Sequence, residues 1–466
     1  MSDAATTFIE RAGDETGTAK AAAVGDAARH LIEKRAAAVE AFPAMDAMRD
    51  RTREIRLHTL AHLDRYLADF VDAVEALGGH VFFAADAEEA NAYVRHVAEE
   101  VNAGLIVKVK SMVTEEIELT AALEGDGREV VETDLGEFIV QIGDDRPSHI
   151  VAPVMHLTRY DVGRLFADKL GVPYTDDPTE LNQIARTHLR RLFLKADMGI
   201  SGVNFAVAST GSIAVVTNEG NGRLSTTAPR VHVAVMGMER IVPTPEDLGV
   251  ALEVLARSAT GQALTTYTNL ITGPRRDGDP DGPEELHVVI VDNGRTKALA
   301  DEVSEALACI RCGACLNVCP VYREIGGHAY GDVYPGPIGS VLSPVLFGFE
   351  GREELPYACT LCGACLEVCP ARIDLPGMLL GLRERIVDDG GTFGWLKPAM
   401  KGYEFAATRP RVWNGTLRGA SVAGRISRSG WFGRLPWPGN AWTKVRDLPA
   451  PSVKTFRKWW GGRNGT

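Results

Sequence analysis

The sequence predicts an α/β domain with a parallel-sheet core, then a helical cysteine-rich domain, then a basic C-terminal region. Three observations support this order. Short apolar strands alternate with helical segments after residue 62, a pattern typical of parallel sheets covered by helices. All eight cysteines lie between Cys309 and Cys369. Lysine, arginine and tryptophan then accumulate towards the end of the chain.

The predicted elements follow the chain. Residues 1–60 are rich in Ala, Glu and Arg, and we expect an N-terminal helical segment there. The α/β domain is expected over residues 61–293, with strands at His80–Ala84, Leu105–Val109, Glu129–Val131, Val231–Val235 and His287–Val291 and a hairpin of Phe205–Ala208 with Ile213–Thr217. Its predicted helices are a run ending near Val101, Ser111–Leu123, Leu181–Asp197 and a helix capped by Thr244.

Composition limits the function classes. The chain has 466 residues, of which 45% are hydrophobic and 24% charged, so it is neither largely disordered nor fibrous. The net charge of -12 argues against nucleic acid as a partner. We expect no signal peptide and no transmembrane helix, because no basic segment precedes an apolar one and no apolar run reaches about 18 residues. The expected location is cytoplasmic, where thiols stay reduced.

The cysteines form one motif that occurs twice. Cys309-Ile-Arg-Cys312-Gly-Ala-Cys315-Leu-Asn-Val-Cys319-Pro320 recurs 50 residues later as Cys359-Thr-Leu-Cys362-Gly-Ala-Cys365-Leu-Glu-Val-Cys369-Pro370, with nine of twelve positions identical. This C-x2-C-x2-C-x3-C-P spacing is that of bacterial ferredoxins, whose fourth cysteine binds the other cluster. Structural zinc is a weak alternative, because it uses two separated C-x2-C pairs.

The spacing therefore predicts two [4Fe–4S] clusters with crossed ligands. Cluster 1 takes Cys309, Cys312, Cys315 and Cys369; cluster 2 takes Cys359, Cys362, Cys365 and Cys319. The segment between the motifs is longer than a compact ferredoxin hairpin needs, and Val341–Phe347 reads as helical or irregular. We therefore predict an α-helical ferredoxin-type domain over residues 294–385.

The C-terminal region, residues 386–466, has an unusual composition. From Lys401 onward it holds 13 Lys and Arg residues against two acidic residues, which leaves a charge of -23 for residues 1–400. All seven tryptophans lie in this region. Two interpretations stay open: docking, onto the acidic body or a partner subunit, and peripheral contact with anionic lipid or the quinone side of a membrane.

The α/β domain lacks the glycine fingerprints of standard nucleotide sites, so no NAD, FAD or ATP site is predicted. Lys108 and Lys110 lie at the C-terminal end of a predicted strand, at the sheet edge where such domains bind ligands. Glu219 and Arg223 lie in a glycine-containing turn. These four residues are candidates for a ligand site, although exposed lysines and plain turns are common. His149, His156, His188 and His232 lack metal-ligand spacing and read as surface or satisfied core residues.

The chain resembles the family of lactate utilisation iron-sulfur protein B over nearly its full length. The stretches that carry the resemblance are Lys108–Met112, Glu132–Glu137, Gly199–Phe205, Ser209–Val216, Glu219–Gly222, Met238–Pro243, Gly326–Tyr330 and Gly336–Gly339. The resemblance implies a LUD domain, related to sugar-phosphate isomerase and CoA-transferase-like α/β folds. It also implies a role in oxidising L-lactate to pyruvate within a complex of three proteins. The cluster cysteines carry over directly, and no catalytic residue is assigned.

Three functions stay open on the sequence alone. The leading hypothesis is an electron-transfer subunit of an L-lactate oxidising complex, since the clusters pass single electrons and two-electron oxidation ordinarily uses a flavin or another cofactor. A second is that the α/β domain is itself an enzyme on an acyl or sugar-phosphate substrate, with Lys108, Lys110 and Glu219 as candidates. A third is a redox-sensing regulator.

Overall fold

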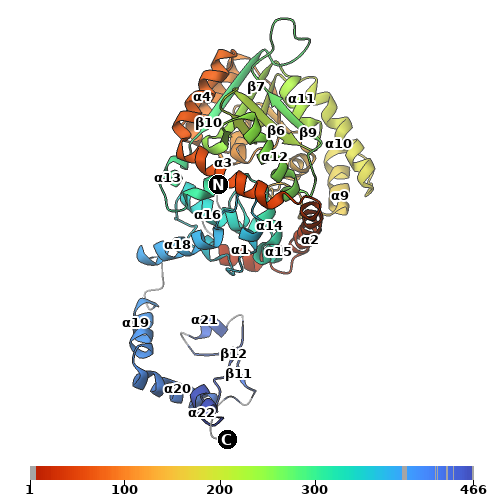
Figure 1. The fold of residues 1–466 in the computed structure, drawn as a ribbon. Helices are drawn as coiled ribbons and strands as arrows, with labels where there is room; N and C mark the ends of the chain where they lie inside the picture. The colour runs from red at the N-terminus through yellow and green to blue at the C-terminus, as the bar shows by residue number, and fades with distance from the viewer. Residues whose placement is uncertain are drawn as a thin grey trace. The chain divides into compact units, whose positions relative to one another are not determined.

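The computed structural model describes residues 7–390, 396–425, 427, 429–436, 439–443 and 446–463. The chain divides into two compact units, Met1–Arg385 and Ile386–Thr466, each described by itself below. Figure 1 labels many of their helices and strands.

A six-stranded sheet in which every pair of neighbours is parallel forms the centre of the first unit. Its strand order is β1 (His80–Ala84), β10 (Glu285–Val291), β7 (Val231–Gly237), β4 (Met198–Gly202), β2 (Leu105–Lys108) and β3 (Glu129–Glu132). The middle strands are almost wholly buried, because helices cover both faces of the sheet. The predicted parallel-sheet core is confirmed.

Side chains alternate between the two faces of this sheet. Val233 and Val289 pack on the face covered by α5 (Ala87–Glu100), α6 (Met112–Glu116) and α7 (Leu119–Gly125). Ala234 and Val288 pack on the other face, against α4 (Leu63–Ala76) and a second sheet. Three further helices cover β2 and β3 on that face: α8 (Leu135–Ile142), α9 (Arg159–Leu170) and α10 (Pro178–Phe193).

The second sheet has four strands in the order β8 (Ile241–Val242), β5 (Phe205–Val207), β6 (Ser212–Thr217) and β9 (Tyr267–Ile271). β5 and β6 form the predicted antiparallel hairpin. Gly211 lies in its turn with a φ of 64°, which favours glycine. The helix α12 (Pro245–Ala259) begins as predicted, since the Thr244 side chain accepts a hydrogen bond from the Asp247 N–H.

The cysteine region that follows is helical, and its described part, residues 294–385, contains no strand. Its elements are α13 (Arg295–Leu299), η2 (Ser304–Ala308), α14 (Ala314–Val318), α15 (Pro320–Ile325), η3 (His328–Tyr330), α16 (Gly336–Phe347), η4 (Leu355–Tyr357), α17 (Ala364–Val368) and α18 (Leu375–Asp388). The predicted helical character is confirmed.

The N-terminal helices join the two parts of this unit. They are α1 (Phe8–Glu15), α2 (Ala19–Glu40) and α3 (Met45–Ala61). α2 packs against α14 and α15 of the cysteine region and also against α12 of the α/β domain, while α3 packs against α12 and η2. Val24 and Ala28 of α2 belong to the same buried core as Leu316 and Tyr322.

One predicted helix, Ser111–Leu123, is wrong in detail. The structure divides it into α6 and α7 at Glu118, whose φ of 53° is left-handed. The break lies just after Glu116, which is held by the Arg295 guanidinium at 2.8 Å. The helix thus breaks beside this buried carboxylate, and α7 restarts with Leu119 and Leu123 packed against the sheet.

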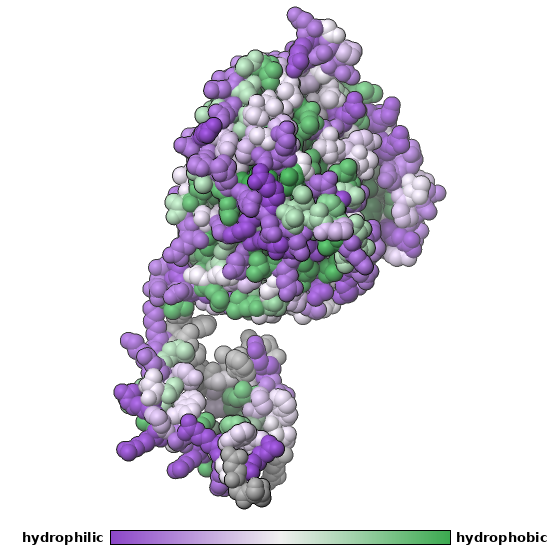
Figure 2. Space-filling model, viewed as in Figure 1, coloured by the Kyte–Doolittle hydropathy of each residue, from purple (hydrophilic) through white to green (hydrophobic). Residues whose placement is uncertain are grey.

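The second unit consists of α19 (Leu396–Ala407), α20 (Pro410–Gly424), β11 (Trp431–Phe432), α21 (Asn440–Thr443), β12 (Leu448–Pro449) and α22 (Phe456–Gly461). Trp431, Trp459 and Trp460 are exposed, and the Arg463 guanidinium lies 5.0 Å from the Trp459 ring centroid. Figure 2 shows hydrophilic and hydrophobic side chains interspersed on its visible face. Trp395 and Trp437 lie outside the described residues. Among the described helices of the chain, none has the length and hydropathy to cross a membrane.

His232 in β7 gives a pH prediction. Burial lowers its pKa from 6.5 to about 3, with a smaller effect from His287. The unfolded chain therefore binds a proton that the folded chain does not, and stability falls as the pH drops from 7.5 to 5.5. This histidine should account for about 1 kcal/mol of that fall. Urea unfolding of His232→Gln, followed by circular dichroism, should show a correspondingly smaller pH dependence.

The matched control is His96→Gln, which removes a histidine whose side chain is 62% exposed. An unchanged pH dependence in His232→Gln would contradict the assignment.

Candidate metal centre and adjoining cavity

The two cysteine motifs share one backbone conformation. Gly313 and Gly363, with φ of 73° and 81°, precede α14 and α17 at equivalent positions. Arg311 and Leu361 are also left-handed, with φ of 59° and 56°. Their N–H groups donate to sulfur, from Arg311 to Cys309 Sγ at 3.4 Å and from Leu361 to Cys359 Sγ at 3.2 Å. The sequence repeat is therefore also a structural repeat.

The structure brings the cysteines together in two groups. Cys309, Cys312, Cys315 and Cys369 line one small apolar cavity. The other group contains Cys365, whose pKa is raised to about 12, mainly by burial and in addition by the neighbouring thiols of Cys359 and Cys319. Burial likewise raises the pKa of Cys319, which has Cys359 and Cys362 beside it. Each group thus combines three cysteines of one motif with the fourth of the other.

These residues fit iron–sulfur clusters. None of the eight cysteines forms a disulfide. Burial raises the pKa of Cys369 to about 11, with Cys309 adding to the shift, so this thiol stays protonated at neutral pH unless a metal-bearing group binds it as the thiolate. Backbone N–H groups point at sulfur, as from Ile373 to Cys369 Sγ at 3.4 Å. Sulfur ligands, apolar walls and N–H donors to sulfur are the features that bind and tune such clusters.

The two motifs differ in exposure. In the first motif Cys312, Gly313 and Leu316 are buried, and Gly313 lies against the His149 ring. In the second motif Leu361 and Cys362 are exposed, and no atom of the described residues lies within 4 Å of a Cβ built on Gly363. One motif therefore faces the protein interior and the other faces solvent.

Arginines from the N-terminal helices hold the end of the second motif. Arg49 in α3 donates to the Cys369 carbonyl at 3.0 Å and to the Glu367 carbonyl at 2.6 Å. Arg35 in α2 donates to the Val368 carbonyl at 3.0 Å. These contacts fix the last turn before Cys369 from outside the cysteine region.

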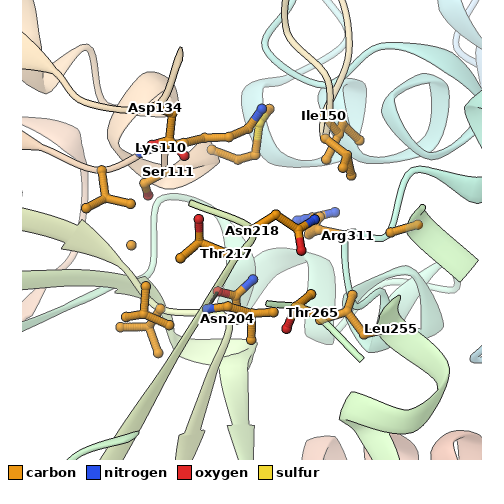
Figure 3. A pocket seen from close by; sticks show the side chains of 18 of the residues that line it. Lys110, Ser111, Asp134, Ile150, Asn204, Thr217, Asn218, Leu255, Thr265 and Arg311 are labelled. Atoms are coloured by element: carbon orange, nitrogen blue, oxygen red, sulfur yellow. Dashed lines mark hydrogen bonds between the residues drawn. The ribbon is translucent and has the colours of Figure 1, made fainter. Parts of the chain in front are cut away.

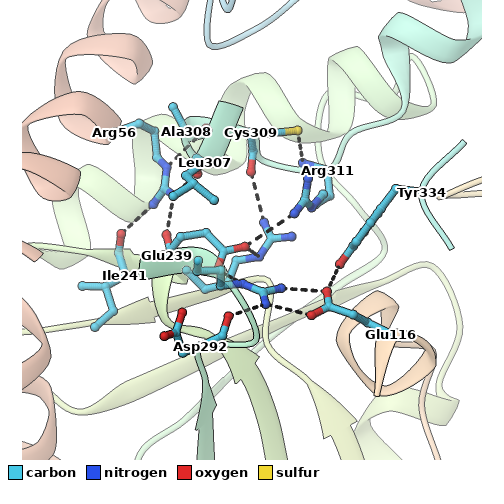
Figure 4. Close-up of polar contacts among 12 residues, drawn as sticks. Arg56, Glu116, Glu239, Ile241, Asp292, Leu307, Ala308, Cys309, Arg311 and Tyr334 are labelled. Atoms are coloured by element: carbon cyan, nitrogen blue, oxygen red, sulfur yellow. Dashed lines mark hydrogen bonds and ion pairs between the residues drawn. The ribbon is translucent and has the colours of Figure 1, made fainter. Parts of the chain in front are cut away.

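A buried network of arginine and glutamate lies behind the first motif (Figure 4). Arg295 pairs with Glu239 at 2.7 Å and with Glu116 at 2.8 Å, and the Tyr334 hydroxyl donates to Glu116 at 2.6 Å. The other arginines of the network are Arg56, Arg240 and Arg311. Arg240 donates to the Cys309 carbonyl at 3.4 Å. Four arginines thus accompany two glutamates beside this motif.

A cavity of about 330 Å³ lies where β2, β4 and β7 end. Figure 3 shows Lys110, Asp134 and Arg311 among the side chains around it. Lys110 pairs with the Glu137 carboxylate at 2.7 Å, and its backbone N–H donates to Asp134 at 2.6 Å. Burial raises the pKa of both Asp134 and Glu219.

Only two of the four candidate ligand residues line the cavity. Lys110 and Glu219 line this cavity. Lys108 does not line it: its Nζ is buried and pairs with Glu132 at 2.6 Å and with Glu115 at 2.9 Å. Arg223 is exposed on α11 (Asn221–Thr227) and is also absent from the lining. Of the two lysines at the end of β2, Lys108 is therefore paired in the protein interior and Lys110 lines the cavity.

Two residues of this region were not among the predicted site residues. Arg311 lines the cavity from within the cysteine motif, and the only signal was that the second motif has Leu361 there. His149 is buried beside Gly313 and accepts N–H groups of Val151 and Ala152 at 3.0 Å on Nδ1. Burial lowers its pKa to about 3, so it stays neutral. No spacing rule connects it to the cysteines.

Three family profiles match the chain. Residues 67–291 match the LUD domain, residues 305–373 the 4Fe-4S dicluster domain, and residues 395–464 the C-terminal domain of lactate utilisation protein B. A solved structure of a duf162 family protein from Deinococcus radiodurans covers 49% of this chain and 98% of that one at 17% identity, with a TM-score of 0.27 that is too low to support an inference.

Several relatives align along nearly the whole chain. One from Bacillus pumilus, named lactate utilization protein B, is 48% identical over 99% of this chain and 98% of its own. Proteins of the same name from Geobacillus kaustophilus and Bacillus subtilis are 50% and 48% identical, over 92% and 95% of this chain and 91% and 93% of theirs.

The buried position of Lys108 gives a stability prediction. Lys108→Met should lower the free energy of unfolding by roughly 3–5 kcal/mol, because Glu132 then stays buried without its cation. Adding Glu132→Gln should recover part of the loss. Urea unfolding followed by circular dichroism measures both. The control Lys169→Met breaks a surface pair and should cost less than about 1 kcal/mol. Equal losses in the two lysine variants would contradict a structural role for Lys108.

Proposed function

The chain belongs to the lactate utilisation protein B family, and from this premise we propose that it is the iron–sulfur electron-transfer subunit of a complex that oxidises L-lactate to pyruvate. The observation that carries the proposal is the arrangement of eight cysteines in two mixed groups of four. An iron–sulfur cluster in each group would supply one-electron transfer.

The proposed ligand sets follow the two groups. Three cysteines of each motif bind one cluster and the fourth cysteine binds the other, as the spacing predicts. The sets are Cys309, Cys312, Cys315 and Cys369 for cluster 1, and Cys359, Cys362, Cys365 and Cys319 for cluster 2. Close contact between α14 and α17 supports two centres near enough for electrons to pass between them.

The exposure of the second motif supports electron exchange with a partner protein at the surface of the chain. Cys362 and Leu361 are at the surface, where a partner protein can approach cluster 2 closely. The first motif is covered by the α/β domain. We therefore propose that electrons are exchanged with a partner through the second motif. Removal of two electrons from the hydroxy acid is assigned to a partner subunit, because this sequence has no standard nucleotide fingerprint.

The second unit is proposed to dock this chain to its partners. Its surface combines Arg and Lys with exposed Trp431, Trp459 and Trp460, and aromatic and arginine side chains are enriched at protein interfaces. Contact with anionic lipid is the alternative, since the same side chains suit a membrane interface.

The electron-transfer role is tested on the complex purified without oxygen from lactate-grown cells. Adding L-lactate should reduce the clusters, seen by EPR, only when the partners are present. The intact chain should hold about eight iron atoms. Cys369→Ala should abolish the same EPR signal as Cys312→Ala, and Cys319→Ala the same signal as Cys362→Ala.

Two outcomes would overturn these assignments. If Cys369→Ala and Cys362→Ala lost the same signal, the crossed ligand sets would be wrong. If lactate failed to reduce the clusters in the intact complex, the electron-transfer role would be wrong.

Truncation tests the second unit. A chain ending at Gly390 keeps the whole helix α18 and should retain full iron content. It should lose co-purification with the partner subunits, because the basic and aromatic surface is gone. Undiminished co-purification would contradict docking, and sedimentation of the full chain with anionic lipid vesicles would then support the membrane alternative.

A further inference from the structure

The cavity at the sheet edge shares a wall with the first cysteine group. Arg311 and Ile150 line both the 330 Å³ cavity and the small cavity formed by Cys309, Cys312 and Cys315 with Cys369. The carboxyl edge of a parallel sheet is where domains of this architecture bind ligands. A molecule in the larger cavity would therefore lie directly beside cluster 1.

Arg311 is buried yet incompletely paired. Its residue exposure is 8%, and Nε and Nη1 have no hydrogen-bond partner among the described residues. Nη2 lies 3.6 Å from Glu239 Oε1, beyond hydrogen-bond distance, and the guanidinium stacks 4.5 Å from the Tyr334 ring centroid. Buried donors without acceptors are costly, most of all on a charged group. These two donors call for an acceptor, and Arg311 is one of the residues that line the 330 Å³ cavity.

The cysteine repeat shows that Arg311 does not serve the motif itself. At the equivalent position Leu361 adopts the same left-handed conformation and makes the same N–H contact to sulfur. The winding of the chain around the cysteines therefore needs no arginine. Only the copy that faces the cavity carries one.

The remaining walls indicate the kind of ligand. Val203, Val216 and Leu255 offer apolar surface for an organic body. Asp134 and Glu219 carry carboxyl groups at the cavity, which disfavour a dianion such as phosphate. A guanidinium presents paired N–H donors that match a carboxylate. The walls therefore fit a singly charged organic acid.

We propose that this cavity binds a small organic carboxylate, whose carboxylate group accepts hydrogen bonds from Arg311. The inference deepens the proposed function and rests on it only in taking cluster 1 to be present. The backbone N–H of the same residue donates to Cys309 Sγ, so a displacement of Arg311 on binding would reach a cluster ligand.

Binding is tested by calorimetry on the anoxic, cluster-loaded full chain without partners. The probes are acetate, pyruvate and L-lactate, with neutral lactamide and inorganic phosphate for comparison. At least one carboxylate should bind about tenfold or more tightly than lactamide and phosphate. Its addition should change the EPR line shape of the reduced signal that Cys312→Ala removes and leave the other signal unchanged.

Two variants test the residues. Arg311→Leu reproduces the second motif and should weaken carboxylate binding about tenfold or more, while the iron content stays intact. Thr265→Trp fills the cavity from a half-exposed position outside the cysteine region and should abolish binding even if Arg311→Leu fails to hold its cluster. Leu361→Arg is the matched control and should leave binding unchanged.

The inference is overturned if no carboxylate binds, if phosphate binds equally well, or if Thr265→Trp binds as the wild type does. Lactate-dependent reduction of the clusters is measured separately, in the intact complex. A failure of carboxylate binding is therefore distinct from a failure of the electron-transfer role.

Discussion

The arrangement of the first unit depends on the buried ion pairs of Arg295. This residue follows the central strand β10 and binds Glu239, just after β7, and Glu116, at the end of α6. Tyr334, from the segment between the two cysteine motifs, shares Glu116. A buried pair of charges tolerates little displacement, because losing one partner strands the other in a medium of low dielectric constant. These ion pairs thereby fix the position of the cysteine region relative to the α/β domain.

This fixed relative position explains why the two nearly identical cysteine motifs have different surroundings. The first motif is pressed against the edge of the sheet and lies beside four arginines and two glutamates, a local excess of positive charge. Thiolate-bound clusters carry negative charge, so an excess of this sign favours their binding at this place. The second motif also meets arginines, Arg35 and Arg49 at its end, but it reaches solvent at Cys362. The near-identical sequences of the two copies therefore hide a difference in exposure to solvent.

Much of the fold could be predicted because it depends on local patterns. Short stretches of sequence are enough to predict the apolar strands, the hairpin around Gly211 and the cap at Thr244. The cluster domain could be predicted equally well, because cysteine spacing alone indicates iron–sulfur binding. Long-range charge pairing could not be predicted. Nothing near Lys108 indicates that Glu132 neutralises it, and nothing near Arg311 indicates a cavity built at the ends of the distant strands β2, β4 and β7.

The helix α2 also has a consequence for how the molecule is made. It is synthesised well before its packing partners α14 and α15, which lie far along the chain. Arg35 and Arg49 likewise make their contacts only once Val368 and Cys369 have been synthesised. Contacts of such long sequence separation slow folding. Insertion of a cluster into the folded site would therefore follow translation of Cys369 and the packing of α2 and α3.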